Sequence, residues 1–153
     1  MEFKAIAHLA FKVADMDRSL DFYCNKLGLR RVFTITYGDL AARTGHVWPG
    51  TEDMQDVPWT TYIEFAPQQF VELFTARPEM EHGVYDDDHI GYLHFALQVE
   101  DIEAAQAELE ARGVEIVTPP RKGASGSIQL WIADPDGNRI ELMQYTPDSM
   151  QLL

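Results

Sequence analysis

The chain contains one pattern twice. The stretch HLAFKVADMDRSLDFY, which begins at His8, lines up with HFALQVEDIEAAQAEL, which begins at His94, at a constant offset of 86 residues. Late in each half a Glu-Leu pair recurs, at Glu72 in FVELFT and at Glu141 in RIELMQ. A repeat of this size indicates two copies of one supersecondary unit. One such sheet alone would expose a face, so we expect the two copies to pack or close around a shared interior.

Hydrophobic periodicity predicts the same order of elements in both halves, an α+β chain of two βαβββ modules. In the first half we expect strands at 5–13, 29–37, 59–66 and 70–75, with a helix at 16–27 between Asp15 and Gly28. In the second half we expect strands at 93–99, 114–118, 127–133 and 138–144, with a helix at 102–112. The modules are bounded at 5–78 and 91–146, and an acidic linker, 79–90, joins them.

The two largest connections carry side chains of their own. Residues 38–58 contain several Gly and Pro residues and are expected to form a long loop. Its Arg43, His46 and Trp48 either form a lid over a site or, as we favour, are ordinary loop residues. Residues 119–126 contain two prolines, two glycines and a serine, and are expected to form a second loop.

Charge and cysteine content restrict the partners. Asp and Glu number 25 against 12 Lys and Arg, a net charge of −13, which argues against nucleic acid or an anionic membrane surface as a partner. The net charge does not exclude a small-molecule partner, because a local cation can outweigh distant charge. Cys24 is the one cysteine, which excludes an internal disulfide and fits a reducing compartment. With no recognisable signal peptide, a cytoplasmic location is expected.

Four titratable residues stand at matched positions of the repeat: His8 and Glu72 in the first half, His94 and Glu141 in the second. Buried in strand-like apolar runs, such groups are costly unless something pairs with them. Taken singly, a strand histidine is more often a satisfied core residue and a glutamate is more often solvated. Their recurrence in both halves favours a metal site, and two imidazoles with two carboxylates suit Zn, Ni, Co, Mn or Fe(II).

Strand alternation places further residues on the same faces as these four. Lys12 shares the face of His8, Gln98 that of His94, Phe74 that of Glu72 and Met143 that of Glu141. We expect these four to line a substrate pocket. For Lys12, contact with a substrate carboxylate or phosphate and a strand-end lysine that reaches solvent are equally good interpretations.

The stretches HLAFKVADMDRSLDFYCNKLGL, FVELF, YLHFALQVEDI and DPDGNRIELMQ resemble the vicinal oxygen chelate superfamily, which includes glyoxalase I, methylmalonyl-CoA epimerase, extradiol dioxygenases and bleomycin-resistance proteins. The resemblance spans roughly residues 5–145. It implies that the whole chain, 1–153, is one domain whose modules form curved mixed sheets around a divalent metal. His8, Glu72, His94 and Glu141 fall on the four-ligand pattern of glyoxalase I. Lys12 and Ala76 stand where bacterial glyoxalase I has glutathione-contacting Arg and Asn residues.

The resemblance also implies an activity. The expected function is a metal-dependent lyase or isomerase of glyoxalase I type, which transfers a proton through a metal-bound enediolate of a small vicinal-oxygen substrate. Glu141 is the expected catalytic base, with Glu72 as the second candidate. The alternatives are a metal-dependent epimerase, an extradiol-type dioxygenase and a metal-free drug-binding resistance protein. A homodimer is expected, because bacterial glyoxalase I shares its sites between chains.

Overall fold

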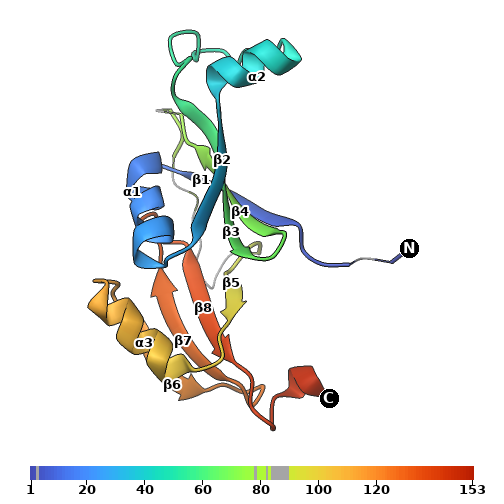
Figure 1. Cartoon of the computed structure of the whole chain (residues 1–153), viewed down its shortest axis with the longest axis vertical. Helices are drawn as coiled ribbons and strands as arrows, with labels where there is room; N and C mark the ends of the chain where they lie inside the picture. The colour runs from blue at the N-terminus through green and yellow to red at the C-terminus, as the bar shows by residue number, and fades with distance from the viewer. Residues whose placement is uncertain (3, 78, 82, 84–89) are drawn as a thin grey trace. The chain divides into compact units, whose positions relative to one another are not determined.

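The computed structural model describes residues 1–2, 4–77, 79–81, 83 and 90–153 (Figure 1). Contacts divide the chain into two units, Met1–Met80 and Glu81–Leu153. Residues 82 and 84–89 of the expected linker lie outside the described residues. That the two modules act as one domain stays a prediction, so each unit is described separately.

The first unit is a four-stranded mixed sheet with the order β1-β4-β3-β2. Strand β1 runs parallel to β4, and the β4–β3 and β3–β2 pairs are antiparallel. Its elements are β1 (His8–Val13), α1 (Met16–Leu20), the π-helix η1 (Asp21–Lys26), β2 (Arg30–Thr36), α2 (Tyr37–Thr44), β3 (Pro58–Ala66) and β4 (Gln69–Thr75).

The helical segment of the first unit covers one face of its sheet. Asp15 caps α1 by accepting a hydrogen bond from the backbone N–H of Arg18, and Gly28, at φ 72°, lies just beyond the end of η1. Tyr23 on η1 is fully buried, as are Val71 and Leu73 on β4. Because side chains alternate along a strand, Glu72 points to the face opposite this core. The core therefore leaves one sheet face available for a site.

The second unit repeats this plan with the sheet order β5-β8-β7-β6. Strand β5 is parallel to β8, and the β8–β7 and β7–β6 pairs are antiparallel. Its elements are β5 (Phe95–Gln98), α3 (Ile102–Ala111), β6 (Thr118–Lys122), β7 (Ile128–Ala133), β8 (Arg139–Gln144) and the 3₁₀ helix η2 (Met150–Leu152). Asp101 caps α3 as Asp15 caps α1. The prediction of an α+β chain with two βαβββ modules is confirmed.

The structure corrects the first long connection. Residues 38–58 were expected to be irregular, but Tyr37–Thr44 form helix α2. Thr36 and Asp39 make a reciprocal capping box, which satisfies two backbone N–H groups at the start of the helix, and Gly45 ends it at φ 71°. The chain then folds back, so that the N–H of Gly38 donates to the carbonyl of Gln55 at 3.0 Å.

The second correction concerns β6, which was expected at 114–118 with a loop through the prolines. Strand β6 instead spans Thr118–Lys122 and includes Pro119 and Pro120. Proline cannot donate to a ladder, so two prolines fit only at a sheet edge or an irregularity. Strand β6 is the last strand of its sheet, and its pairing with β7 is irregular between Thr118 and Arg121.

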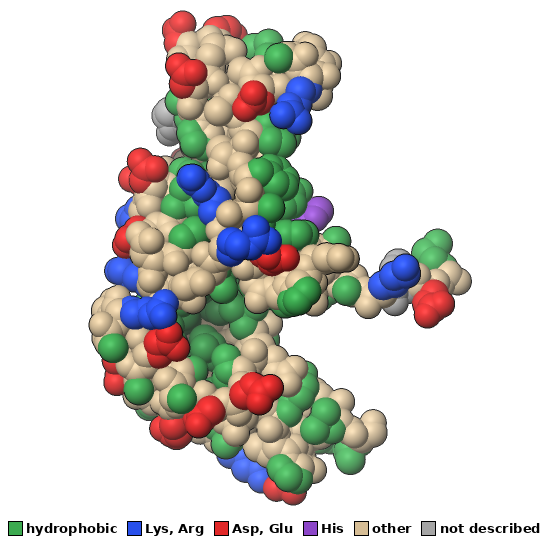
Figure 2. All heavy atoms as spheres, in the orientation of Figure 1, with side chains coloured by type: hydrophobic (Ala, Val, Ile, Leu, Met, Phe, Trp, Pro, Cys, Tyr) green, Lys and Arg blue, Asp and Glu red, His purple; other side chains and the backbone are tan. Residues whose placement is uncertain are grey.

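Two features concern the surface of the units. Figure 2 shows acidic side chains scattered over the visible face with basic ones among them. Across the part of the chain that is described, no helix is long and apolar enough to cross a bilayer.

Candidate metal and substrate site

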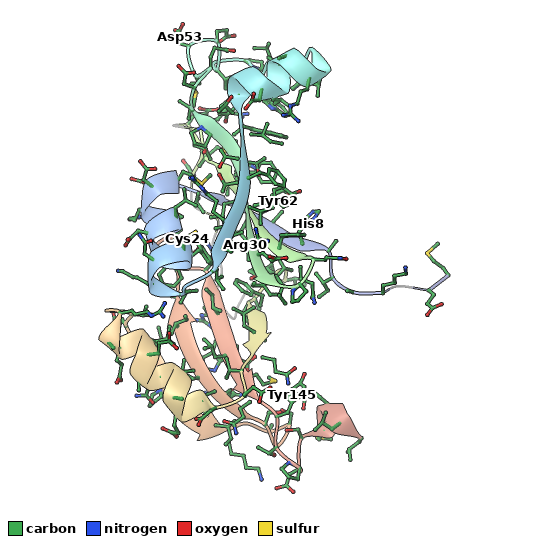
Figure 3. All side chains as sticks on the ribbon, in the orientation of Figure 1. His8, Cys24, Arg30, Asp53, Tyr62 and Tyr145 are labelled. Carbon is green, nitrogen blue, oxygen red and sulfur yellow. The ribbon has the colours of Figure 1, made fainter. Side chains whose placement is uncertain are left out.

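The first unit brings His8 and Glu72 together. His8 begins β1 and Glu72 lies in the middle of the adjacent β4, with 3.5 Å between Nε2 of the imidazole and Oε2 of the carboxylate. The Glu72 side chain is 10% exposed and that of His8 is 45% exposed. The carboxylate is thus nearly buried and the imidazole is partly exposed. His8 lies on the sheet face away from the helical segment that carries Cys24 (Figure 3).

The second unit repeats the pair with His94 and Glu141. Nε2 of His94 lies 3.3 Å from Oε2 of Glu141, whose side chain is 5% exposed against 29% for the imidazole. His94 was expected within a strand, but β5 begins one residue later, at Phe95. The pair forms nonetheless, because Glu141 stands on β8, the strand to which β5 is paired.

Cross-strand register shows that the two pairs are equivalent. Glu72 lies opposite Ala10 on one side and Tyr62 on the other, and Glu141 lies opposite Ala96 and Trp131. An aromatic ring therefore flanks each pair from the third strand. The ring of Tyr62 meets the His8 ring edge-on at 5.9 Å between centroids. The ring of Trp131 meets His94 in the same way at 4.6 Å.

The polar contacts of the two glutamates differ. The hydroxyl of Thr60 donates to Oε1 of Glu72 at 3.3 Å. Burial, a hydrogen bond to the Glu72 carboxylate and the charge of that carboxylate, in that order, raise the pKa of Tyr62 to about 12. The corresponding side chains of the second unit bond to each other, since Nε1 of Trp131 donates to Oε1 of Gln129 at 3.2 Å.

Each pair fits a divalent metal by its donor atoms. An imidazole nitrogen and a carboxylate oxygen that share one ion at about 2.1 Å, at tetrahedral to octahedral angles, lie roughly 3.0 to 3.4 Å apart. The observed separations, 3.5 Å and 3.3 Å, are close to this range. Nδ1 of His94 is buried without a hydrogen-bond partner among the described residues. The described contacts thus leave one nitrogen of His94 unsatisfied, which is uncommon for a histidine kept for core structure.

Within either unit, no third His, Cys, Asp or Glu of the described residues joins its pair in a group that could hold a metal. Each unit thus contains two of the four expected ligands. That His8, Glu72, His94 and Glu141 hold one ion together stays a prediction.

The expected substrate-binding residues lie four residues after each histidine and two residues after each glutamate. Lys12 is opposite Phe74 in the β1–β4 pair, and Gln98 is opposite Met143 in the β5–β8 pair. Lys12 and Gln98 are exposed, whereas Phe74 and Met143 are half-buried. The structure therefore places one polar and one apolar side chain opposite each other further along the β1–β4 and β5–β8 pairs, and their contact with substrate stays a prediction.

The loop residues and the cysteine lie apart from the His8–Glu72 pair. His46 and Trp48 meet edge-on at 4.4 Å in the connection after α2, and the Arg77 guanidinium lies 5.8 Å from the Trp48 ring. Cys24 lies on η1, on the other side of the sheet from His8 (Figure 3). Burial raises the pKa of the Cys24 thiol, although Arg31 opposes this. A raised pKa disfavours the thiolate, so Cys24 has no sign of a nucleophile.

Sequence reasoning missed the flanking residues on the third strand of each sheet, Thr60 and Tyr62 on β3 and Gln129 and Trp131 on β7. The offset of 69 residues that relates Glu72 to Glu141 also relates Tyr62 to Trp131 and Thr60 to Gln129. Extension of this offset beyond the Glu-Leu pair was therefore the available signal.

Comparison with known proteins agrees with the fold and the repeat. The model of the Glyoxalase/Bleomycin resistance protein/Dioxygenase superfamily matches residues 5–142. A lactoylglutathione lyase of Arabidopsis thaliana is 25% identical over 147 residues, which cover 92% of this chain but only 44% of the plant protein. A 2-epi-5-epi-valiolone epimerase of an Actinomyces species is 26% identical over 148 residues, with 91% of this chain and 78% of the epimerase covered.

The solved structures include a glyoxalase family protein from Enterococcus faecalis, with a TM-score of 0.68 and 25% identity over 94% of this chain and 99% of that chain. Its likeness supports the glyoxalase-like fold read from the two sheets. With a repeated βαβββ unit, a histidine–glutamate pair in each copy and a family model that matches nearly the whole chain, this protein belongs to the Glyoxalase/Bleomycin resistance protein/Dioxygenase superfamily.

Proposed function

We propose that this protein is a metal-dependent lyase or isomerase of glyoxalase I type that acts on a small substrate with two adjacent oxygens. The observation that carries the proposal is the equivalent histidine–glutamate pair of each unit, with a nearly buried carboxylate and donor atoms 3.3 to 3.5 Å apart. The relatives named lactoylglutathione lyase support the reaction class.

The proposed site residues have two roles, metal binding and proton transfer. His8, Glu72, His94 and Glu141 would hold the divalent metal, whose Lewis acidity stabilises negative charge that develops on the substrate oxygens. Glu141 takes a proton from the carbon next to the carbonyl and returns it to the neighbouring carbon. Glu72 is the second candidate for this role.

Elemental analysis and isotope exchange test the proposal together. We expect the purified protein to carry about one divalent ion among Zn, Ni, Co, Mn and Fe per complete site, and His94→Ala to lose most of it. A thermal-shift screen of oxo-acids, sugars and thiol adducts then identifies substrates, and turnover in D₂O should leave deuterium at the carbon that receives the proton. Full metal occupancy in His94→Ala would contradict the ligand assignment.

A metal-dependent epimerase is the second candidate, favoured by the similarity to the valiolone epimerase. The same carboxylates would remove the proton, but it would return to the same carbon on the opposite face. Deuterium at the original carbon of a product with inverted configuration would identify this reaction. Oxygen uptake would instead identify an extradiol-type dioxygenase, and an absence of metal would favour a drug-binding protein.

We also propose that the protein is a homodimer in the cytoplasm. A symmetric dimer is the commonest oligomer, and two half-sites in one chain can be completed by a partner. The single Cys24 is compatible with the reducing conditions of that compartment.

A further inference from the structure

The two units differ in the polar contacts around their equivalent glutamates, Glu72 and Glu141. In the first unit, the Thr60 hydroxyl donates to the Glu72 carboxylate at 3.3 Å, and Tyr62 lies directly opposite Glu72 in the β3–β4 pair. In the second unit the side chains at the equivalent positions, Gln129 and Trp131, bond to each other. The described polar contact of Glu141 is with Nε2 of His94.

Packing restricts the side chains that flank the glutamate in each unit. The Tyr62 ring is stacked on Phe33 at 4.5 Å between centroids and meets Phe70 edge-on at 5.8 Å, which restricts its movement. The Gln129 amide lies against Gly123, where an added Cβ would come within 2.2 Å of Nε2. Glycine at position 123 therefore leaves room for Gln129 to accept the bond from Trp131.

We propose that Thr60, through its hydroxyl, and Tyr62, from the position opposite Glu72, are positioning groups that fix the orientation of Glu72 as a carboxylate ligand of the site. The inference rests on the proposed function, since it assigns supporting groups to one carboxylate of that site. Hydroxyl donors to a ligating carboxylate fix its orientation, and the loss of such a partner commonly weakens metal affinity 10- to 100-fold.

Burial makes the hydroxyl of Thr60 separable from its packing. Thr60 is 1% exposed, and valine replaces it with nearly the same shape but no hydroxyl. Serine keeps the hydroxyl and removes the methyl group. If the hydroxyl matters, Thr60→Val is the defective variant, whereas if only packing matters, Thr60→Ser is. Thr61→Val is the matched control, because Thr61 is equally buried and its hydroxyl contacts Thr34 instead.

The experiment loads the full chain with Co²⁺ and measures the affinity, the rate of release to EDTA and the visible absorption spectrum. We expect Thr60→Val and Tyr62→Phe each to weaken affinity and speed release about tenfold or more, and to alter the cobalt spectrum. Thr60→Ser and Thr61→Val should stay within about twofold of wild type. Circular dichroism of each variant without metal verifies that it is folded.

The outcomes separate this inference from the proposed function. Wild-type protein that binds no Co²⁺ would overturn both. Tight binding by the wild type together with unchanged release and spectrum in Thr60→Val and Tyr62→Phe would overturn the inference and leave the function intact. A defect in Thr60→Ser as large as that in Thr60→Val would also overturn it, because packing and not the hydroxyl would then be responsible.

Discussion

At the scale of single residues, the glutathione contacts are the sharpest test of substrate choice. Lys12 and Ala76 lie at the same end of the β1–β4 pair, where Lys12 is opposite Phe74 and the N–H of Ala76 donates to the carbonyl of Val13. We expect weak or absent turnover of the glutathione hemithioacetal of methylglyoxal. Each charged or amide contact that is lost costs about 1 to 3 kcal/mol, which is roughly five- to more than a hundredfold in kcat/KM.

The double variant Lys12→Arg/Ala76→Asn supplies the control for that prediction. It should raise kcat/KM for the hemithioacetal and leave metal content unchanged, because neither residue is an expected ligand. Wild-type turnover as efficient as that of typical enzymes, about 10⁴ M⁻¹s⁻¹ or above, would show that these two positions do not decide the substrate.

Cys24 supports a second prediction about a single residue. Burial raises its pKa, so less of the thiol is ionised at a given pH in the folded protein than in the unfolded chain. Alkylation by iodoacetamide at pH 8 should therefore be slower in the folded protein than in urea. Equal rates in the two states, measured by mass spectrometry, would show that the thiol is neither shielded nor perturbed.

The site shows which residues a sequence can and cannot identify. His8, Glu72, His94 and Glu141 were found because the repeat aligns them, and the structure brings each histidine to its glutamate. Thr60 and Tyr62 were missed because they approach Glu72 from a neighbouring strand. Contacts across a sheet depend on strand register, which packing and turns determine and which short sequence patterns do not reveal.

At the scale of elements, two glycines with the same backbone conformation have different surroundings. Gly126 and Gly137 have φ values of 85° and 84°. A Cβ at Gly126 would lie 2.3 Å from the carbonyl oxygen of Asp148, whereas no atom lies within 4 Å of a Cβ at Gly137. In both alanine variants the left-handed conformation should lower the free energy of unfolding by about 1 to 2 kcal/mol. In Gly126→Ala the clash with Asp148 should lower it further. Urea unfolding measures the difference, and equal losses would contradict this account.

The elements that sequence patterns predicted correctly are those in which local preference and packing agree. Both long helical segments follow an aspartate cap, and the strands of the core alternate as expected. Helix α2 was missed because Gly and Pro residues after it dominated the interpretation, although Thr36 and Asp39 form a capping box. Strand β6 was displaced because Pro119 and Pro120 are tolerated only at the edge of a sheet, and edges are defined by the assembled order of strands.

At the scale of the whole molecule, the proposed four-ligand site needs a half-site from each module. The repeat predicts two modules, and these can combine in two ways. The two modules of one chain can form a site together, or the first module of one chain can form a site with the second module of a partner chain. Residues 77–90 do not decide it, because about 14 extended residues reach roughly 45 Å and permit either arrangement. A functional site in a symmetric dimer can therefore be completed within a chain or between chains.

Mixing two inactive variants answers the question. His8→Ala damages the half-site of the first unit and His94→Ala that of the second, and each homodimer should bind little metal. If sites are shared between chains, a mixed dimer refolded from mild denaturant has one intact site and one doubly damaged site, so metal binding and activity return in part. If each chain forms its own site, every site stays damaged and no activity returns. We expect recovery, and light scattering that shows only monomers would reject the dimer before any mixing is done.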